Sequence, residues 1–168
     1  SWVTLTYTLK AIWSPFVDRF QIPILSKSLG QRRSWLIVSQ SLVAIALFGM
    51  AFSDPADSLY VLILFALLVG FSSATQDICI DAMRIELVSA QELGEASAMY
   101  QGGWRLAFLL TQVVTFIIAS SFDWSTAYIA AAFLMILVIY ASFIKVPEPE
   151  RVVKEYISIF NQPTVWFR

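Results

Sequence analysis

The chain has 168 residues, of which 58% are hydrophobic and 14% are charged, and its formal net charge is -1. Soluble domains are about 45–50% apolar and about 25% charged, so one soluble core of this size could not bury so much apolar surface. The single cysteine, Cys79, excludes a disulfide framework and a cysteine zinc cluster, and the absence of histidine removes the commonest general base and metal ligand.

Five apolar stretches follow one another along the chain. A membrane helix needs roughly 20 mostly apolar residues; four stretches reach that length, and the first is shorter, with Pro15 near its end. We predict an all-α fold, a polytopic membrane helical bundle, with spans at residues 2–17, 34–53, 59–83, 96–122 and 125–144. Residues 1–146 then form a partial N-terminal transmembrane bundle, and residues 147–168 form a cytoplasmic linker or the start of a next segment.

The basic residues predict which way the spans point. Two of the 11 lysines and arginines, Lys10 and Arg105, lie inside spans, and the others fall in residues 17–33, 84–95 and 145–168. Alternating spans place these three segments on one side, and cytoplasmic loops carry the excess of positive charge. We therefore expect that side to be cytoplasmic. We also expect the chain to be part of a longer protein, with one more span ahead of it if the full protein has a cytoplasmic N-terminus.

Four ionisable residues lie inside spans or at their inner ends: Lys10, Asp77, Asp81 and Arg105. Such a group near mid-membrane costs roughly 2.5–3.5 kcal/mol even on lenient insertion scales, so each needs a partner or water. Helix rise puts Lys10, Asp77 and Arg105 at similar depths, on the order of 10–14 Å from the cytoplasmic ends of their spans. A hairpin turning near Gln91 then places Asp77 opposite Arg105.

Two glutamines and an arginine extend this polar set. Gln40 is expected level with Lys10, Gln112 continues the face of Arg105, and Arg84 shares a helix face with the two aspartates. One interpretation is a set of structural pairs that fix helix packing; the other is a polar pathway for a proton, an anionic substrate or both. Both remain open. Three glutamates are expected to be solvated loop charges: Glu86, Glu92 and Glu95.

Most tryptophans, including Trp13 and Trp104, lie near predicted span ends. Interfacial belts place tryptophan at such positions. We therefore favour a belt or packing role for these two residues over stacking against a sugar.

The loop after the first span resembles the signature of the major facilitator superfamily, a Gly-x-x-x-Asp-Arg-x-Gly-Arg-Arg pattern between the second and third helices. Residues 18–19 (DR) and 30–33 (GQRR) supply the match, while Ser14 replaces the first glycine and residues 21–29 look like an insertion. In such carriers two halves rock about a mid-membrane site. The resemblance implies a conformational latch made of Asp18, Arg19, Arg32 and Arg33.

Three segments are similar to the AmpG muropeptide permeases. Residues 10–19 (KAIWSPFVDR) resemble their K-x-x-W-S-P-x-x-D-R segment, and residues 76–82 (QDICIDA) resemble their Q-D-I-x-x-D-A at the end of the fourth helix. Residues 103–106 (GWRL) resemble their G-Y-R-L in the fifth helix. Acetyl-CoA transporters share the Q-D-I-x-x-D feature, so the resemblance indicates the clan more strongly than the substrate.

The resemblance implies a multi-pass carrier of the bacterial inner membrane that imports anhydro-muropeptides for cell-wall recycling, driven by protons and without a cofactor. Its expected partners are the lipid bilayer, protons, a small anionic sugar-peptide and the C-terminal half of the same protein. Asp77 is then the candidate proton carrier, and Lys10 and Arg105 either contact anionic groups of the substrate or hold Asp77. The substrate or coupling pathway comprises Lys10, Gln40, Asp77, Asp81, Arg105 and Gln112.

Three rival functions differ in class or in substrate. A transporter of acetyl-CoA or another anionic solute would use the same architecture. An intramembrane enzyme holding a metal would need more oxygen ligands than Asp77 and Asp81, because span 96–122 contains no acidic residue. A structural or assembly factor derived from a carrier would bind substrate without flux. The basic residues are scattered along one membrane face, which does not predict nucleic-acid binding.

Overall fold

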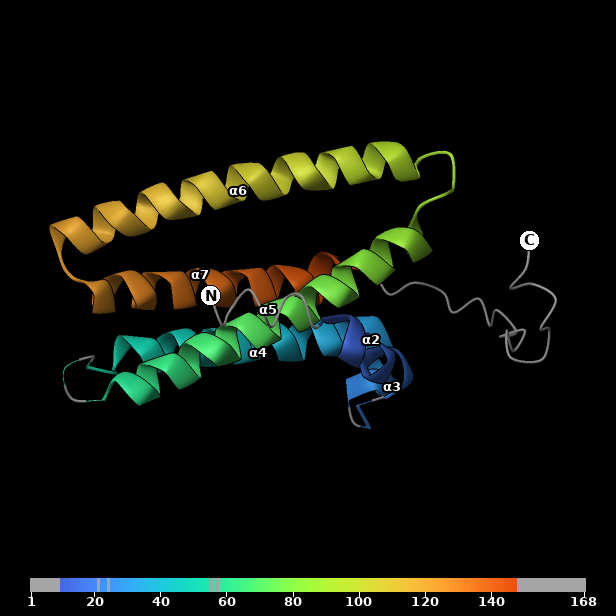
Figure 1. The fold of residues 1–168 in the computed structure, drawn as a ribbon. Helices are drawn as coiled ribbons and strands as arrows, with labels where there is room; N and C mark the ends of the chain where they lie inside the picture. Colours follow the sequence, from blue (N-terminus) through green and yellow to red (C-terminus); the bar gives the residue numbers. More distant parts are fainter. Residues whose placement is uncertain (1–9, 21, 24, 55, 57, 148–168) are drawn as a thin grey trace, which may run out of the picture.

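A computed structural model describes residues 10–20, 22–23, 25–54, 56 and 58–147 of the chain. The regular structure of these residues is helical, and its order (Figure 1) is α2 (Lys10–Arg19), α3 (Leu25–Leu29), α4 (Gln31–Ala51), α5 (Leu59–Leu87), α6 (Leu93–Ser121) and α7 (Trp124–Lys145). The last four of these are long and apolar enough to cross a membrane. The expected all-α membrane bundle is confirmed.

The four long helices overlap four of the predicted spans, with ends that differ by a few residues. Of the first predicted span, 2–17, only the part from Lys10 onward lies within the described residues, where α2 contains Pro15. The apparent insertion at 21–29 contains the short helix α3. The predicted linker lies outside the described residues, apart from its first residue, Pro147.

Two helix starts are explained by single residues. Gly30 precedes α4 with φ 86°, a left-handed conformation that only glycine adopts without a steric penalty. Asp123 precedes α7, and its Oδ1 accepts a hydrogen bond of 2.6 Å from the backbone N–H of Thr126. This N-cap satisfies one of the N–H groups that have no partner inside the helix.

Helix α4 is the centre of the arrangement, because it packs along both α5 and α7. Helix α6 runs along the outside of this group (Figure 1), and none of its residues is buried. The α4–α5 and α6–α7 turns lie at one end of the bundle, whereas α2, α3 and the α5–α6 turn lie at the other. This second end carries the basic loops, which we predict to be cytoplasmic.

A cluster of buried apolar residues lies at that second end. It joins α2, α4 and α5 through five buried residues: Val17, Leu36, Ile78, Cys79 and Met83. Trp13 and Trp35 pack against the cluster, and Trp13 also meets Phe71 with ring centroids 5.0 Å apart. The lone cysteine is completely buried. The cluster therefore anchors α2 beside the polar part of α5.

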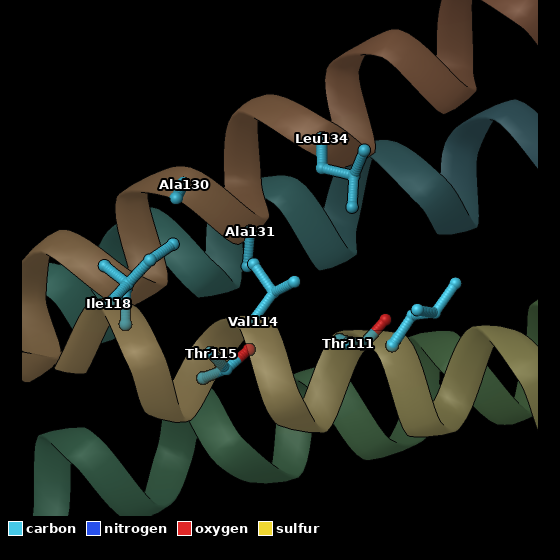
Figure 2. Close-up of a pocket in the computed structure, with 9 residues that line it drawn as sticks. Thr111, Val114, Thr115, Ile118, Ala130, Ala131 and Leu134 are labelled. Carbon is cyan, nitrogen blue, oxygen red and sulfur yellow. The ribbon is translucent and has the colours of Figure 1, made fainter. Parts of the chain in front are cut away.

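An apolar groove lies between the second half of α6 and the first half of α7, near the turn that joins them (Figure 2). Thr111, Thr115 and Ile118 line its α6 wall, and Ala130 and Ala131 line its α7 wall. The small alanine side chains leave this space open. The two threonines also show which side of α6 is turned towards α7.

Candidate functional site

A polar cluster joins α5 to α6 near the turn between them. The Tyr100 hydroxyl donates to Oδ1 of Asp77 over 3.5 Å, and the Arg84 guanidinium lies 4.8 Å from the centroid of the Tyr100 ring. Arg84 Nη2 also donates to Oδ1 of Asp81 over 3.0 Å. The predicted shared face of Asp77, Asp81 and Arg84 is thus held by charge pairing and by one aromatic residue of α6.

The predicted contact between Asp77 and Arg105 does not form. Tyr100 occupies the place opposite Asp77, and the Arg105 side chain is exposed. Among the described residues no carboxylate forms an ion pair with Arg105. The physical reason is that α5 and α6 diverge beyond their turn (Figure 1), so equal depth in the membrane does not bring two side chains together.

Gln40 belongs to α4, and its side chain faces α7 instead of α5. It is 2% exposed, and its Nε2 donates to Oγ of Ser142 over 3.0 Å. Its Oε1 is buried and has no hydrogen-bond partner among the described residues. Gln112 is exposed on α6. The side chain of Lys10 lies outside the described residues, so its predicted level with Gln40 stays a prediction.

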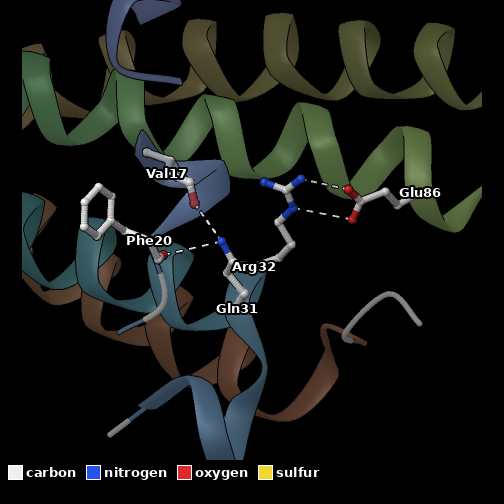
Figure 3. A network of polar contacts seen from close by, with 5 residues as sticks. All are labelled: Val17, Phe20, Gln31, Arg32 and Glu86. Atoms are coloured by element: carbon white, nitrogen blue, oxygen red, sulfur yellow. Dashed lines mark hydrogen bonds and ion pairs between the residues drawn. The ribbon is translucent and has the colours of Figure 1, made fainter. Parts of the chain in front are cut away.

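The first turn of α4 holds the end of α2 (Figure 3). Gln31 is buried, and its Nε2 donates to the backbone oxygens of Val17 and Phe20 over 3.0 and 3.4 Å. Trp35 Nε1 donates to the same Phe20 oxygen over 2.8 Å. These donors satisfy carbonyl groups that α2 leaves unpaired where it ends.

The two arginines of the same turn reach two further helices. Arg32 forms a two-point ion pair with Glu86 of α5 (Figure 3), at 2.8 Å from Nη2 to Oε1 and 3.4 Å from Nε to Oε2. Arg33 Nη2 donates to the backbone oxygen of Phe143 near the end of α7. Glu86 is exposed to solvent, as expected, but it does not lie in a loop, because α5 extends to Leu87 and carries Glu86 to Arg32.

The predicted latch residues are therefore only partly described. Arg32 and Arg33 bind helices of the same half of the bundle, and the side chains of Asp18 and Arg19 lie outside the described residues. Gln31 was not singled out by the sequence, since a glutamine in a loop motif carries no distinctive signal. Its position directly after the positive-φ Gly30 fixes its direction.

Tyr100 is the other residue that the sequence did not single out. Counting outward from the facing ends of α5 and α6 pairs Arg84 with position 96 and Asp77 with position 103, and Tyr100 lies between them. This count was available from the sequence once the helix ends were known. Of these groups Asp77 is the one that can take up and release a proton inside a span, with the Tyr100 hydroxyl as its hydrogen-bond partner.

Comparisons with known proteins agree with the motifs. The profile of the Major Facilitator Superfamily matches residues 1–166 of the chain. A relative from Rickettsia prowazekii (strain Madrid E) that carries the name AmpG 3 is 39% identical over 129 residues, which are 76% of this chain and 31% of the relative. A relative from Rickettsia conorii named AmpG 4 is 36% identical over 159 residues, 94% of this chain and 38% of the relative.

A third similar protein is the anhydromuropeptide permease of Escherichia coli (strain K12). It is 33% identical over 150 residues, which are 89% of this chain and 30% of that permease. The chain thus spans about a third of the length of the curated relatives it matches. No solved structure matches it.

Proposed function

Because the chain belongs to the major facilitator superfamily of membrane transporters, we propose that its parent protein imports anhydro-muropeptides across a bacterial inner membrane and that protons drive this import. The AmpG-named relatives and the name of the Escherichia coli permease support the substrate. The three AmpG-like segments lie on α2, α5 and α6, and Asp77, in the second of them, contacts Tyr100, which precedes the third on α6.

The observation that carries the proposal is an acidic side chain inside a membrane span, in contact with a neighbouring helix. Charged Asp77 accepts the hydrogen bond of Tyr100. Protonated Asp77 becomes a donor itself and no longer needs that contact. Proton binding therefore changes what holds α5 to α6, which is the kind of two-state element that coupling requires.

We assign roles to the other predicted pathway residues from the charge of their side chains. Arg105, and Lys10 on α2, attract anionic groups of the substrate, while Asp81 neutralises Arg84 through their 3.0 Å contact. Gln40 and Gln112 supply uncharged polar groups.

Asp18 and Arg19 act as the latch, and Arg32 and Arg33 hold the half-bundle together so that it moves as one body. If Asp18→Asn left the balance of inward- and outward-open states unchanged in a crosslinking assay, the latch role would be discarded.

The test is counterflow uptake of labelled anhydro-muropeptide into liposomes that contain the full-length parent protein, with and without an inward proton gradient. We expect the gradient to stimulate uptake. Asp77→Asn removes the proton site but keeps the shape, so counterflow should persist while most of the gradient stimulation is lost. The matched control is Asp123→Asn, in the turn between α6 and α7, which should keep both activities.

No uptake by folded wild-type protein would overturn the proposed substrate. The same liposomes would then be assayed with acetyl-CoA and other anionic solutes.

A further inference from the structure

The residues of α6 divide into two unlike faces. At 100° per residue, the apolar residues Leu106, Leu109 and Val113 fall on one side of the helix. The opposite side carries a stripe of polar and aromatic residues, here called the α6 stripe: Tyr100, Gln101, Trp104, Arg105, Phe108 and Gln112. Polar and charged side chains in a span face away from lipid. The α6 stripe therefore faces protein or a water-filled path.

One edge of the α6 stripe is placed against the bundle. Tyr100 contacts Asp77 on α5, and Thr111, which lies beside the stripe on the helix surface, lines the groove towards α7 (Figure 2). The rest of the stripe is uncovered by the described residues. Trp104 is 54% exposed, Phe108 is 51% exposed, and Arg105 is also exposed.

Of the two roles expected for Trp104, an interfacial belt or packing, its position along α6 favours packing. It follows Leu93, the first residue of α6, by about eleven residues, or roughly 16 Å of helix. Its ring stacks on Phe108, with centroids 5.7 Å apart and planes inclined by 19°. The pair forms a flat apolar surface in the middle of a span, and Arg105 is the next residue of the stripe.

This combination suits one class of ligand. The C–H groups of a sugar ring carry a small positive partial charge, and the face of an aromatic ring is negative. A guanidinium binds a carboxylate through two parallel hydrogen bonds. Arg105 lies within a membrane span and forms no ion pair with a carboxylate of the described residues. Its positive charge is one that an anionic ligand would neutralise.

We propose that Trp104 and Phe108 stack against a sugar ring of the transported muropeptide and that Arg105 binds a carboxylate of its peptide. This proposal rests on the proposed function, and it makes α6 the helix that recognises the junction of sugar and peptide.

The first experiment measures which face of α6 meets water. Single cysteines replace Trp104, Phe108, Leu106 or Leu109 in the full-length parent in liposomes, with Cys79 and any other native cysteine replaced by alanine. A small hydrophilic maleimide should label positions 104 and 108 but not 106 and 109. Saturating anhydro-muropeptide should slow labelling at 104 and 108 several-fold. Equal labelling of both faces, or no protection by a substrate that the wild type transports, would overturn the proposal.

The second experiment separates the two parts of the ligand. Uptake of anhydro-muropeptide is compared with uptake of the same molecule carrying methyl-esterified peptide carboxylates. Trp104→Leu should raise KM about tenfold for both, the change produced by losing about 1.4 kcal/mol of binding. Arg105→Gln should raise KM for the acid and abolish the preference for the acid over the ester. The control, Leu106→Ala, should change neither.

The outcomes distinguish the two proposals. If the wild type transports neither compound, the proposed function fails. If the wild type transports the acid but Trp104→Leu keeps its KM, or Arg105→Gln keeps the preference for the acid, the function stands and the α6 binding site is wrong.

Discussion

Tyr100 connects two charged groups of α5 through two different parts of one side chain. Its hydroxyl reaches Asp77, and its ring lies under Arg84. A net hydrogen bond contributes about 0.5–1.5 kcal/mol, and a partly exposed cation–π contact about 0.5–1 kcal/mol. Two substitutions can therefore measure the two contacts separately.

We predict that Tyr100→Phe lowers the free energy of unfolding of the full-length parent by about 1 kcal/mol or less, because the ring remains under Arg84. Tyr100→Leu should lower it by about 1 kcal/mol more, because the cation–π contact is lost too. Unfolding in mixed SDS micelles measures both values. The control is Met99→Leu, an exposed position next to Tyr100. Equal losses for Phe and Leu would show that the ring does not hold Arg84.

The sequence identified the charged residues of the site but not all of their contacts. Asp77, Asp81 and Arg84 were found because ionisable residues are rare within apolar runs. Tyr100 was missed because tyrosine is unremarkable in a membrane helix. The predicted Asp77–Arg105 pairing was wrong because the sequence gives the depth of each side chain in the membrane. It does not give the direction in which the side chain points or the distance between the two helices.

At the scale of elements, the first turn of α4 is a junction of helix ends. Gln31 holds α2, Arg32 holds α5 and Arg33 holds α7. The hydropathy of the chain predicted where the four long helices lie, because span length depends only on local composition. It could not predict that α4 is central, because each apolar helix offers several faces and only three-dimensional packing selects among them.

A charge reversal tests the bond between α4 and α5. The Arg32 and Glu86 side chains are 17% and 41% exposed, so solvent screening limits the pair to about 0.5–1 kcal/mol. Glu86→Arg should destabilise the full-length parent by at least this amount, and adding Arg32→Glu should restore most of the loss. Chemical unfolding of the four members of this double-mutant cycle gives the coupling. Additive losses would contradict the ion pair, and Glu92→Arg serves as the control.

The start of α7 should respond to acid. The Thr126 side chain and then its backbone N–H hold the pKa of Asp123 below its ordinary value of 3.8. A carboxylate with a lowered folded pKa stabilises the fold above its unfolded pKa, and this stabilisation is lost as pH falls through the folded value. Asp123→Ala should therefore be less stable than wild type at neutral pH, with the difference shrinking as pH falls through the lowered pKa of Asp123.

Asp123→Ser is the comparison for this helix start, because serine caps a helix without titrating. Its stability relative to Asp123→Ala should stay constant with pH, as measured by unfolding midpoints across the acid range. A difference between wild type and Asp123→Ala that persists in acid would contradict the role of the carboxylate.

At the scale of the whole molecule, the chain is part of a multi-pass membrane protein of the major facilitator superfamily. The grouping of turns at two opposite ends (Figure 1) makes the predicted orientation testable. We expect a membrane-impermeant maleimide to label Ser53→Cys and Phe122→Cys from outside intact cells. Ser89→Cys and Glu92→Cys, in the α5–α6 turn, should be labelled only after the cells are opened. The reverse pattern would show that the positive-charge bias misassigned the cytoplasmic face.

The central position of α4 also sets the timing of biogenesis. Gln40 and Arg33 find their partners on α7, at Ser142 and Phe143, which are synthesised 102 and 110 residues later. At roughly 5–20 residues per second, translation needs roughly 5–20 s to supply them. For that interval the Gln40 amide and the Arg33 guanidinium lack these two contacts with α7. The packing of α4 is therefore completed only after α7 has been made, although α4 is long and apolar enough to cross a membrane by itself.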